Sequence, residues 1–267
     1  MRQIDDAVPV LEVKGLKVEF NCKSHIVHAV NGVSLKVMPG KISAIVGESG
    51  CGKSVTASAV MNLIDTPGEI VEGEIILSGR NFLELPRRVQ RSMLGNSIGM
   101  IFQDPFESLN PRMKIGDIVI EAIRANKKIS RKEADSSARE LLSRMKLSDV
   151  TVLMSRYPHQ LSGGMCQRVM IAIAMAQKPP LLIADEPTTA LDVTVQARIL
   201  DEIVSLRDDN NTGVLFITHD LCVVAEIADD VYIMKDGQIV EYGEVTRIFD
   251  NPAHKYTKEL LQSILCV

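Results

Sequence analysis

Eight consecutive residues form a glycine-rich segment that ends in a lysine and a serine, namely Gly47-Glu48-Ser49-Gly50-Cys51-Gly52-Lys53-Ser54. The segment fits the pattern GxxxxGK[ST]. Its glycines let the backbone wrap around a phosphate with several N–H groups pointing inward, and the start of a following helix adds partial positive charge. Lys53 would then reach the β- and γ-phosphates, and the Ser54 hydroxyl would bind Mg²⁺. The segment therefore predicts nucleotide binding.

The sequence on both sides supplies the elements that such a loop needs. Residues 42–46 (ISAIV) are continuously apolar, as in a strand buried on both faces, and residues 55–63 follow as a helical stretch without proline or glycine. A glycine-rich turn can match the pattern by chance, but this strand and helix are the expected context of a phosphate-binding loop. We expect Val55, at the start of the helix, to lie beside the nucleotide.

A pair of acids, Asp185 and Glu186, ends a second apolar run, residues 181–185. A strand that carries a carboxylate to a phosphate-binding loop commonly holds Mg²⁺ through water, which predicts Asp185 as the metal-binding acid. Glu186 follows it, where it could accept a proton from an attacking water. Such a pair alone is more often a turn or a helix start, so its meaning depends on the loop.

A third segment, Ser162-Gly163-Gly164, opens an apolar helical stretch. Ser162 is a candidate N-cap, and two glycines in the first turn leave backbone N–H groups open to a phosphate. The segment could also be an ordinary capped helix start. Because the loop already supplies one helix end, a second one suggests a γ-phosphate held between the two.

Strand patterns alternate with helical ones along most of the chain. Buried-strand runs such as 181–185 and 214–218 predict an α/β fold with a mostly parallel sheet. Residues 10–20 and 32–38 alternate apolar and polar side chains instead, as half-exposed strands do. The charged sequence between about 103 and 161 has no buried-strand run, and we interpret it as a helical insertion.

Composition and charge exclude several classes of protein. The 267 residues carry 30 Lys and Arg against 34 Asp and Glu, so there is no broad basic field for nucleic acid or anionic lipid. The five scattered cysteines are typical of reduced thiols in a cytoplasmic protein. The N-terminus lacks the apolar core of a signal peptide, and the longest apolar run, 169–176, is far shorter than the roughly 18–20 residues of a membrane helix. Work at a membrane would need spans from other chains.

Five ordered motifs together resemble the ATP-binding-cassette (ABC) ATPases. They are the glycine-rich loop, LSGGMCQR at 161–168, LLIADEP at 181–187, TALD at 189–192 and His219 in FITHD. The resemblance covers residues from about 11 to 261. It implies an ABC nucleotide-binding domain over 1–251, with a P-loop core, an antiparallel β subdomain and a helical subdomain at about 104–162. A short helical tail would follow at 252–267.

The resemblance implies roles in ATP hydrolysis for single residues. Phe20 would stack on adenine, and Gln103 would contact Mg²⁺ and sense a membrane partner. Lys53, Glu186 and His219 would be catalytic, with His219 on the γ-phosphate. Mg²⁺ would be held by Ser54, Gln103 and Asp185.

The family also implies a head-to-tail dimer with two ATP sites. Ser162, Gly163 and Gly164 of one subunit would face the ATP on the loop of the other, and residues 189–192, including Asp192, would line the interface.

Longer matches resemble the ATPases of bacterial oligopeptide, dipeptide and nickel importers. They are QDPFESLNPRMKIGD, YPHQLSGGM, DEPTTALDVTVQARIL and NPAHKYTKELL. The resemblance implies two membrane permease subunits, an extracytoplasmic solute-binding protein and a second cassette, either a different chain, which we favour, or a second copy. The chain would lie at the cytoplasmic face of the membrane. Its residues do not distinguish a peptide from a nickel or other metal chelate.

Two positions depart from this subgroup. Met165 stands where glutamine is commoner in the signature, and Lys255 where the late motif usually has proline. Cys266 is the only cysteine near the C-terminus, so we expect no cysteine-bound cluster there.

Two other classes remain as alternatives. A soluble cassette ATPase acting on DNA or ribosomes would usually carry two cassettes or a long coiled-coil insertion, and the net charge of −4 disfavours nucleic acid. A P-loop GTPase or kinase would lack LSGGM, and no guanine-reading NKxD pattern is present, since Lys128 and Ile129 follow Asn126-Lys127.

Overall fold

The computed structural model describes residues 8–189 and 191–264. The expectations for the first seven residues, for Ala190 within TALD and for Cys266 therefore lie outside the described residues. The strands are β1 (Leu11–Cys22), β2 (His25–Val37), β3 (Ile42–Val46), β4 (Gly68–Leu77), β5 (Arg80–Asn81), β6 (Ile98–Ile101), β7 (Leu181–Asp185), β8 (Gly213–Thr218), β9 (Asp230–Lys235) and β10 (Gln238–Glu244). The helices are α1 (Lys53–Val60), α2 (Arg87–Met93), α3 (Pro105–Ser108), α4 (Ile115–Arg124), α5 (Arg131–Arg144), α6 (Val150–Ser155), α7 (Gly163–Met175), α8 (Val193–Asn210), α9 (Leu221–Ile227), α10 (Val245–Asp250) and α11 (Lys255–Ile264).

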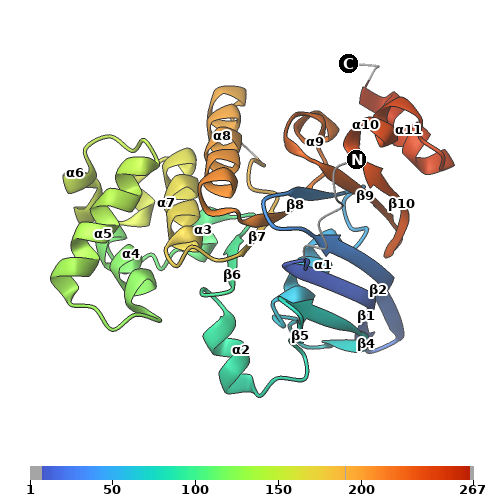
Figure 1. The fold of residues 1–267 in the computed structure, drawn as a ribbon, viewed down its shortest axis with the longest axis horizontal. Coiled ribbons are helices and arrows are strands. Elements are labelled where there is room, and N and C mark those ends of the chain that lie inside the picture. Colours follow the sequence, from blue (N-terminus) through green and yellow to red (C-terminus); the bar gives the residue numbers. More distant parts are fainter. Residues whose placement is uncertain (1–7, 190, 265–267) are drawn as a thin grey trace.

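The described residues form two sheets, and the smaller one lies at the lower right in Figure 1. The larger has the order β10-β9-β3-β8-β7-β6, and all its strands run parallel except the edge strand β10. The smaller, β2-β1-β4-β5, is antiparallel. Helix α1 packs between the sheets, because Ala57, Ala59 and Val60 belong to one apolar cluster with residues of both. The predicted α/β fold with a mostly parallel sheet is confirmed.

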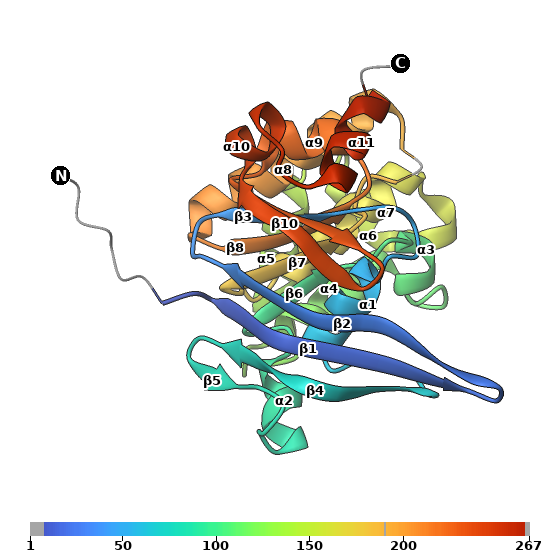
Figure 2. The ribbon, with the colours of Figure 1, turned by 90° about the vertical axis from the view of Figure 1, so that its right-hand side faces the viewer.

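The strand predictions succeed where burial is complete. β3 and β7 have the predicted bounds, and every residue in them is buried. β2 was expected from residue 32 but begins at His25, because it pairs with β1 through a long hairpin (Figure 2). Residues 25–28 are exposed, so no apolar alternation marks that part of the strand.

The region between residues 103 and 161 is helical, as expected. It contains α3 to α6 and a short 3₁₀ turn at Pro158–Gln160, and no strand lies in this fully described interval. Helix α5 begins with a capping box, in which the Ser130 hydroxyl accepts from the Glu133 N–H and the Glu133 carboxylate accepts from the Ser130 N–H. Helices α4, α5 and α6 pack against α7 in one apolar cluster, on the left in Figure 1.

One carboxyl group lies inside this helical core. Glu202 on α8 is 6% exposed, and neither carboxylate oxygen has a hydrogen-bond partner among the described residues. Burial raises the pKa of Glu202 to about 7, although the positive charges of Arg168 and Lys146 oppose the shift. The folded chain therefore holds a proton here at pH values where the unfolded chain, with a pKa near 4.5, has released it.

We expect Glu202→Gln to stabilise the protein at high pH only. The neutral form of Glu202 contributes stability that is full below about pH 4.5 and is lost as the pH rises to about 7. Glutamine carries no charge and so avoids the free-energy cost of burying a carboxylate. At pH 8 the variant should therefore be more stable by about 1–2 kcal/mol. Thermal unfolding of both proteins at pH 5 and pH 8 measures this, with exposed Glu226→Gln as control. An equal difference at both pH values would refute the assignment.

Candidate functional site

The predicted site residues lie at one edge of the larger sheet. Four neighbouring parallel strands, β3, β8, β7 and β6, end there, followed in that order by the glycine-rich loop, His219, the Asp185–Glu186 pair and Gln103. The carboxyl ends of parallel strands are where α/β proteins place ligands. A cleft of about 390 Å³ opens at this edge and is lined by Ala29, Ser49, Gly50, Gly52, Lys53, Ser54, Val55, Gln103, Glu186 and His219.

The loop from Gly47 to Ser54 depends on its glycines in two places. A side chain at Gly47 would collide with the Met234 carbonyl oxygen of β9. Gly52 has a φ of 107°, in the left-handed region that favours glycine, and a side chain there would collide with the Ala29 carbonyl. The loop is therefore wedged between β9 and β2.

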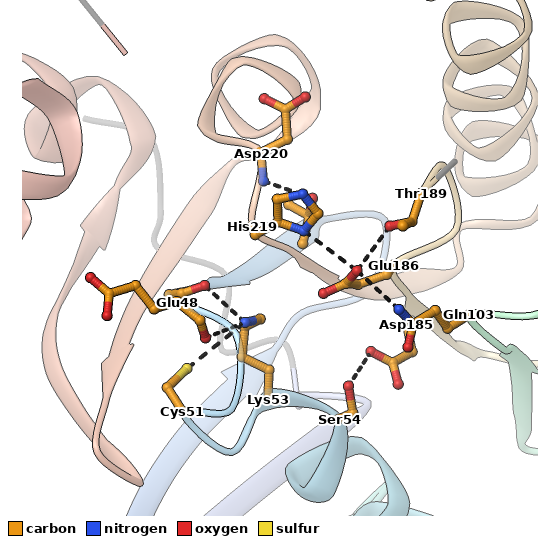
Figure 3. Close-up of polar contacts among 12 residues, drawn as sticks. Glu48, Cys51, Lys53, Ser54, Gln103, Asp185, Glu186, Thr189, His219 and Asp220 are labelled. Carbon is orange, nitrogen blue, oxygen red and sulfur yellow. Dashed lines mark hydrogen bonds and ion pairs between the residues drawn. The ribbon is translucent and has the colours of Figure 1, made fainter. Parts of the chain in front are cut away.

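Lys53 bends back over this loop. Its ammonium group donates to the carbonyl oxygens of Gly47 (2.8 Å) and Glu48 (2.9 Å), and it lies 3.8 Å from the Cys51 sulfur (Figure 3). Lys53 is 4% exposed, so these carbonyls replace water around its charge. A phosphate in the cleft would compete with them for the same ammonium group.

Ser54 and Asp185 meet beside the loop. The Ser54 hydroxyl donates to Asp185 Oδ1 at 3.0 Å. Burial raises the pKa of Asp185, and the hydrogen bond from Ser54 opposes this shift. A hydroxyl and a buried carboxylate oxygen are the hard ligands that Mg²⁺ prefers, so the residues present fit this ion.

Glu186 is the centre of a polar network. Its Oε2 accepts from the Thr189 hydroxyl at 2.8 Å and from Gln103 Nε2 at 3.3 Å, and lies 3.4 Å from His219 Nδ1 (Figure 3). No hydrogen bond to Oε1 is found within the described part of the chain. One oxygen is thus held from three directions, while the other is available to a water molecule.

The backbone of Glu186 is unusual. Its φ is 46°, in the left-handed region that costs a non-glycine residue of order 1–3 kcal/mol. Its N–H donates to the Ile217 carbonyl of β8 at 2.9 Å, which holds this conformation. The strain turns Glu186 away from the strand direction of Asp185 and is typical of a functional site.

His219 occupies the turn between β8 and α9. The Asp220 N–H donates to the Thr218 hydroxyl (3.0 Å), and the Asp220 carboxylate caps α9 by accepting from Cys222 N (2.8 Å). These bonds fix the turn on both sides of His219. The imidazole is 57% exposed and faces Glu186.

The second glycine segment, residues 162–164, lies outside the cleft. Ser162 has the extended backbone of an N-cap, but its side chain makes no capping hydrogen bond, and it is exposed. A Cβ at Gly163 would have ordinary contacts of 3.8 Å or more, whereas one at Gly164 would press on Val195. None of Ser162, Gly163 and Gly164 lines the cleft of their own chain.

Phe20 and Asp192 are also outside the cleft lining, as are Asp185 and three residues of the loop, Gly47, Glu48 and Cys51. The Phe20 ring lies against Gly68, at the end of the apolar cluster between the sheets. Asp192 caps α8, because its carboxylate accepts from Val195 N at 3.0 Å. The structure therefore gives Asp192 a local structural role.

Two residues of the site, Thr189 and Ala29, were not predicted from the sequence to contribute to the cleft. Thr189 was assigned to a dimer interface, yet its hydroxyl makes the shortest hydrogen bond to the Glu186 carboxylate. Ala29 of β2 lines the cleft from the other sheet. The three-residue spacing from Glu186 to Thr189 is the only signal that could have suggested the first contact.

Comparisons with known proteins agree with the motifs. A family model described as "ABC transporter" matches residues 30–189. The chain is 48% identical to a probable peptide ABC transporter ATP-binding protein of Sinorhizobium fredii, over 96% of the chain and 76% of the relative. It is 49% identical to a dipeptide transport ATP-binding protein of Lactococcus lactis, over 96% and 73%. Against a glutathione import ATP-binding protein of Salmonella choleraesuis it is 48% identical over 97% of the chain but spans only 42% of that relative.

Solved structures of cassettes are similar as well. A dimeric ATP-binding cassette in a post-hydrolysis state, bound to ADP and phosphate, matches with a TM-score of 0.79 and 27% identity, over 88% of this chain and 98% of the other. A Clostridium perfringens protein that is part of an ABC transporter complex matches with a TM-score of 0.75 and 25% identity, over 97% and 95%. Within residues 8–189 and 191–264, no helix is long and apolar enough to span a membrane.

Proposed function

The chain belongs to the ABC transporter family, and on this premise we propose that its cleft is the ATP site of a subunit that powers peptide import. The observation that carries the proposal is the convergence of the loop, Asp185, Glu186, Gln103 and His219 at four adjacent strand ends. The sequence-based assignment to the ABC ATPases is confirmed by the family match, and it excludes a GTPase or kinase.

The loop and Lys53 bind the phosphates in this proposal. Backbone N–H groups at the start of α1 face the anion. The Lys53 ammonium group exchanges the carbonyls of Gly47 and Glu48 for the β- and γ-phosphates. Its charge therefore has hydrogen-bond acceptors both before and after ATP binds. Mg²⁺, when bound by Ser54, Asp185 and Gln103, would neutralise charge on the phosphate oxygens.

Glu186 acts on the attacking water. Its Oε2 is fixed by Thr189, Gln103 and His219, so Oε1 can accept a proton from water in one defined orientation. His219, beside it and partly exposed, donates to the γ-phosphate. Phe20 stacks on the adenine from the end of β1.

Gln103 links the site to the helical subdomain. It lies two residues after the end of β6 and two before α3, so a movement of α3 to α6 would change its 3.3 Å hydrogen bond to Glu186. We assign the docking of a membrane permease subunit to this helical subdomain, which puts the chain at the cytoplasmic face of the membrane.

A second cassette completes the site. Ser162, Gly163 and Gly164 do not line the cleft of their own chain. At the start of α7, Ser162 is exposed and Gly163 half-buried, whereas Gly164 is buried. In a head-to-tail dimer they reach the γ-phosphate on the partner's loop. Two permease subunits and an extracytoplasmic solute-binding protein complete the importer, and the relatives named for peptides, dipeptides and glutathione support a peptide as its solute.

Lys53→Ala tests the ATP site. We expect loss of measurable ATP binding, because the variant removes the only ammonium group among the residues that line the cleft. Calorimetric titration with Mg-ATP measures this, with exposed Lys23→Ala as control. Unchanged affinity in Lys53→Ala would place the ATP site elsewhere.

A further inference from the structure

The peptide bond between Gly47 and Glu48 is held at both of its polar atoms. The Gly47 carbonyl accepts from the Lys53 ammonium group at 2.8 Å, and the Glu48 N–H donates to the hydroxyl of Tyr256 at 3.2 Å. Tyr256 belongs to α11, more than 200 positions later in the chain, and its role was not foreseen from the sequence. The C-terminal helix thus contacts the phosphate-binding loop directly.

Tyr256 is itself firmly placed. It is 4% exposed and lies in an apolar cluster with residues of α9 and β9, and the Lys235 ammonium group lies 4.5 Å from the centre of its ring. The start of α11 is fixed by Glu241, whose carboxylate accepts from Ala253 N (2.7 Å) and His254 N (3.0 Å). The hydroxyl therefore reaches the loop from a rigid support.

A second bond ties the other side of the loop to the same region. The Gly237 N–H, in the turn between β9 and β10, donates to the Cys51 carbonyl at 3.0 Å. Gly50 lies between Glu48 and Cys51, the two residues that these hydrogen bonds hold. A Cβ placed on Gly50 would have no other atom within 4 Å. The tip of the loop is open to a ligand, while its two sides are held by the C-terminal part of the fold.

We propose that Tyr256 is a positioning residue for the ATP site. A phosphate-binding loop works through the directions of its N–H groups, and these directions depend on the orientation of each peptide bond. The Tyr256 hydroxyl fixes the Gly47–Glu48 peptide, and so preserves the loop geometry when Lys53 leaves the Gly47 carbonyl for the phosphates. This inference rests on the proposed ATP site and adds that the docking of α11 is coupled to ATP affinity.

Tyr256 should affect binding and leave the chemical step unchanged, because it touches the loop and not the Glu186 network. In Tyr256→Phe the ring, its packing and the contact with Lys235 remain, and only the hydrogen bond to Glu48 is lost. We expect the Kd and KM for ATP to rise about three- to tenfold, as for the loss of one hydrogen bond, with kcat nearly unchanged.

Tyr232→Phe is the matched control. The Tyr232 hydroxyl is also buried and bonds to the backbone of Lys36, at 3.0 Å to its N–H and 3.3 Å to its carbonyl, away from the loop. Both variants lose one tyrosine hydroxyl, so both report the effect on folding stability. Only Tyr256→Phe should weaken ATP binding.

The experiment measures ATP binding by calorimetry and steady-state hydrolysis for the full chain and both variants. Wild-type ATP affinity in Tyr256→Phe, an equal loss in Tyr232→Phe, or a fall in kcat without a rise in KM would each overturn the proposal. Lys53→Ala separates it from the proposed function. If Lys53→Ala abolishes ATP binding while Tyr256→Phe binds normally, the ATP site stands and only the role of Tyr256 fails.

Discussion

Glu186→Gln should bind ATP about as tightly as the unsubstituted chain but hydrolyse it at least about 100-fold more slowly. Glutamine keeps the size of the side chain, can still accept from Thr189 and Gln103, and still lies beside His219. It cannot take a proton from water, so the step that the carboxylate performs is lost while the phosphate contacts of Lys53 and the loop remain.

The measurement is the release of phosphate by the assembled complex, together with ATP affinity by calorimetry. Glu74→Gln, an exposed acid on β4, is the control for the loss of one charge. Thr189→Val should give a smaller loss, since Gln103 and His219 still hold the carboxylate. Near-normal hydrolysis by Glu186→Gln would exclude Glu186 as the group that activates water.

Gly163→Asp should abolish hydrolysis by the assembled cassette pair, with a loss of at least about 100-fold, and leave ATP binding by the isolated chain unchanged. Gly163 has room for a side chain, and an aspartate at the first position of α7 is favourable for the helix. The variant should therefore fold normally. Its carboxylate would lie where the γ-phosphate on the partner cassette must approach, and two anions repel each other there.

Gly163→Ala separates charge from size. It fits the same space and should retain most of the activity. Weaker ATP binding by the isolated Gly163→Asp chain would show that the segment acts within one chain, and full hydrolysis by the assembled pair would show that it does not face the phosphate at all.

The local elements of the site could be predicted from the sequence because they depend on short-range signals. The continuous apolar runs before Lys53 and Asp185 mark strands buried on both faces, and these strands have the predicted bounds. The role of His219 came from the family resemblance. Its position beside Glu186 depends on β8 lying between β3 and β7, an order that no local pattern encodes.

The remaining contacts depend on pairs of residues that are distant in sequence. Tyr256 gives no sign in the sequence that its hydroxyl reaches Glu48, since an aromatic residue in an amphipathic helix is usually only part of the core. The burial of Glu202 is hidden for the same reason, because its helix α8 carries several charged residues and the side chain becomes buried only when the chain folds. Tertiary packing decides both.

We propose that ATP hydrolysis at this cleft drives peptide import. The most direct test isolates the complex that co-purifies with the chain, reconstitutes it in lipid vesicles and measures ATP turnover and the uptake of labelled di- and oligopeptides together. We expect peptide to raise ATP turnover, and uptake to require ATP and to vanish in Glu186→Gln. ATP turnover that no peptide changes but that nucleic acid stimulates, with no peptide uptake, would show that this cleft does not power peptide import.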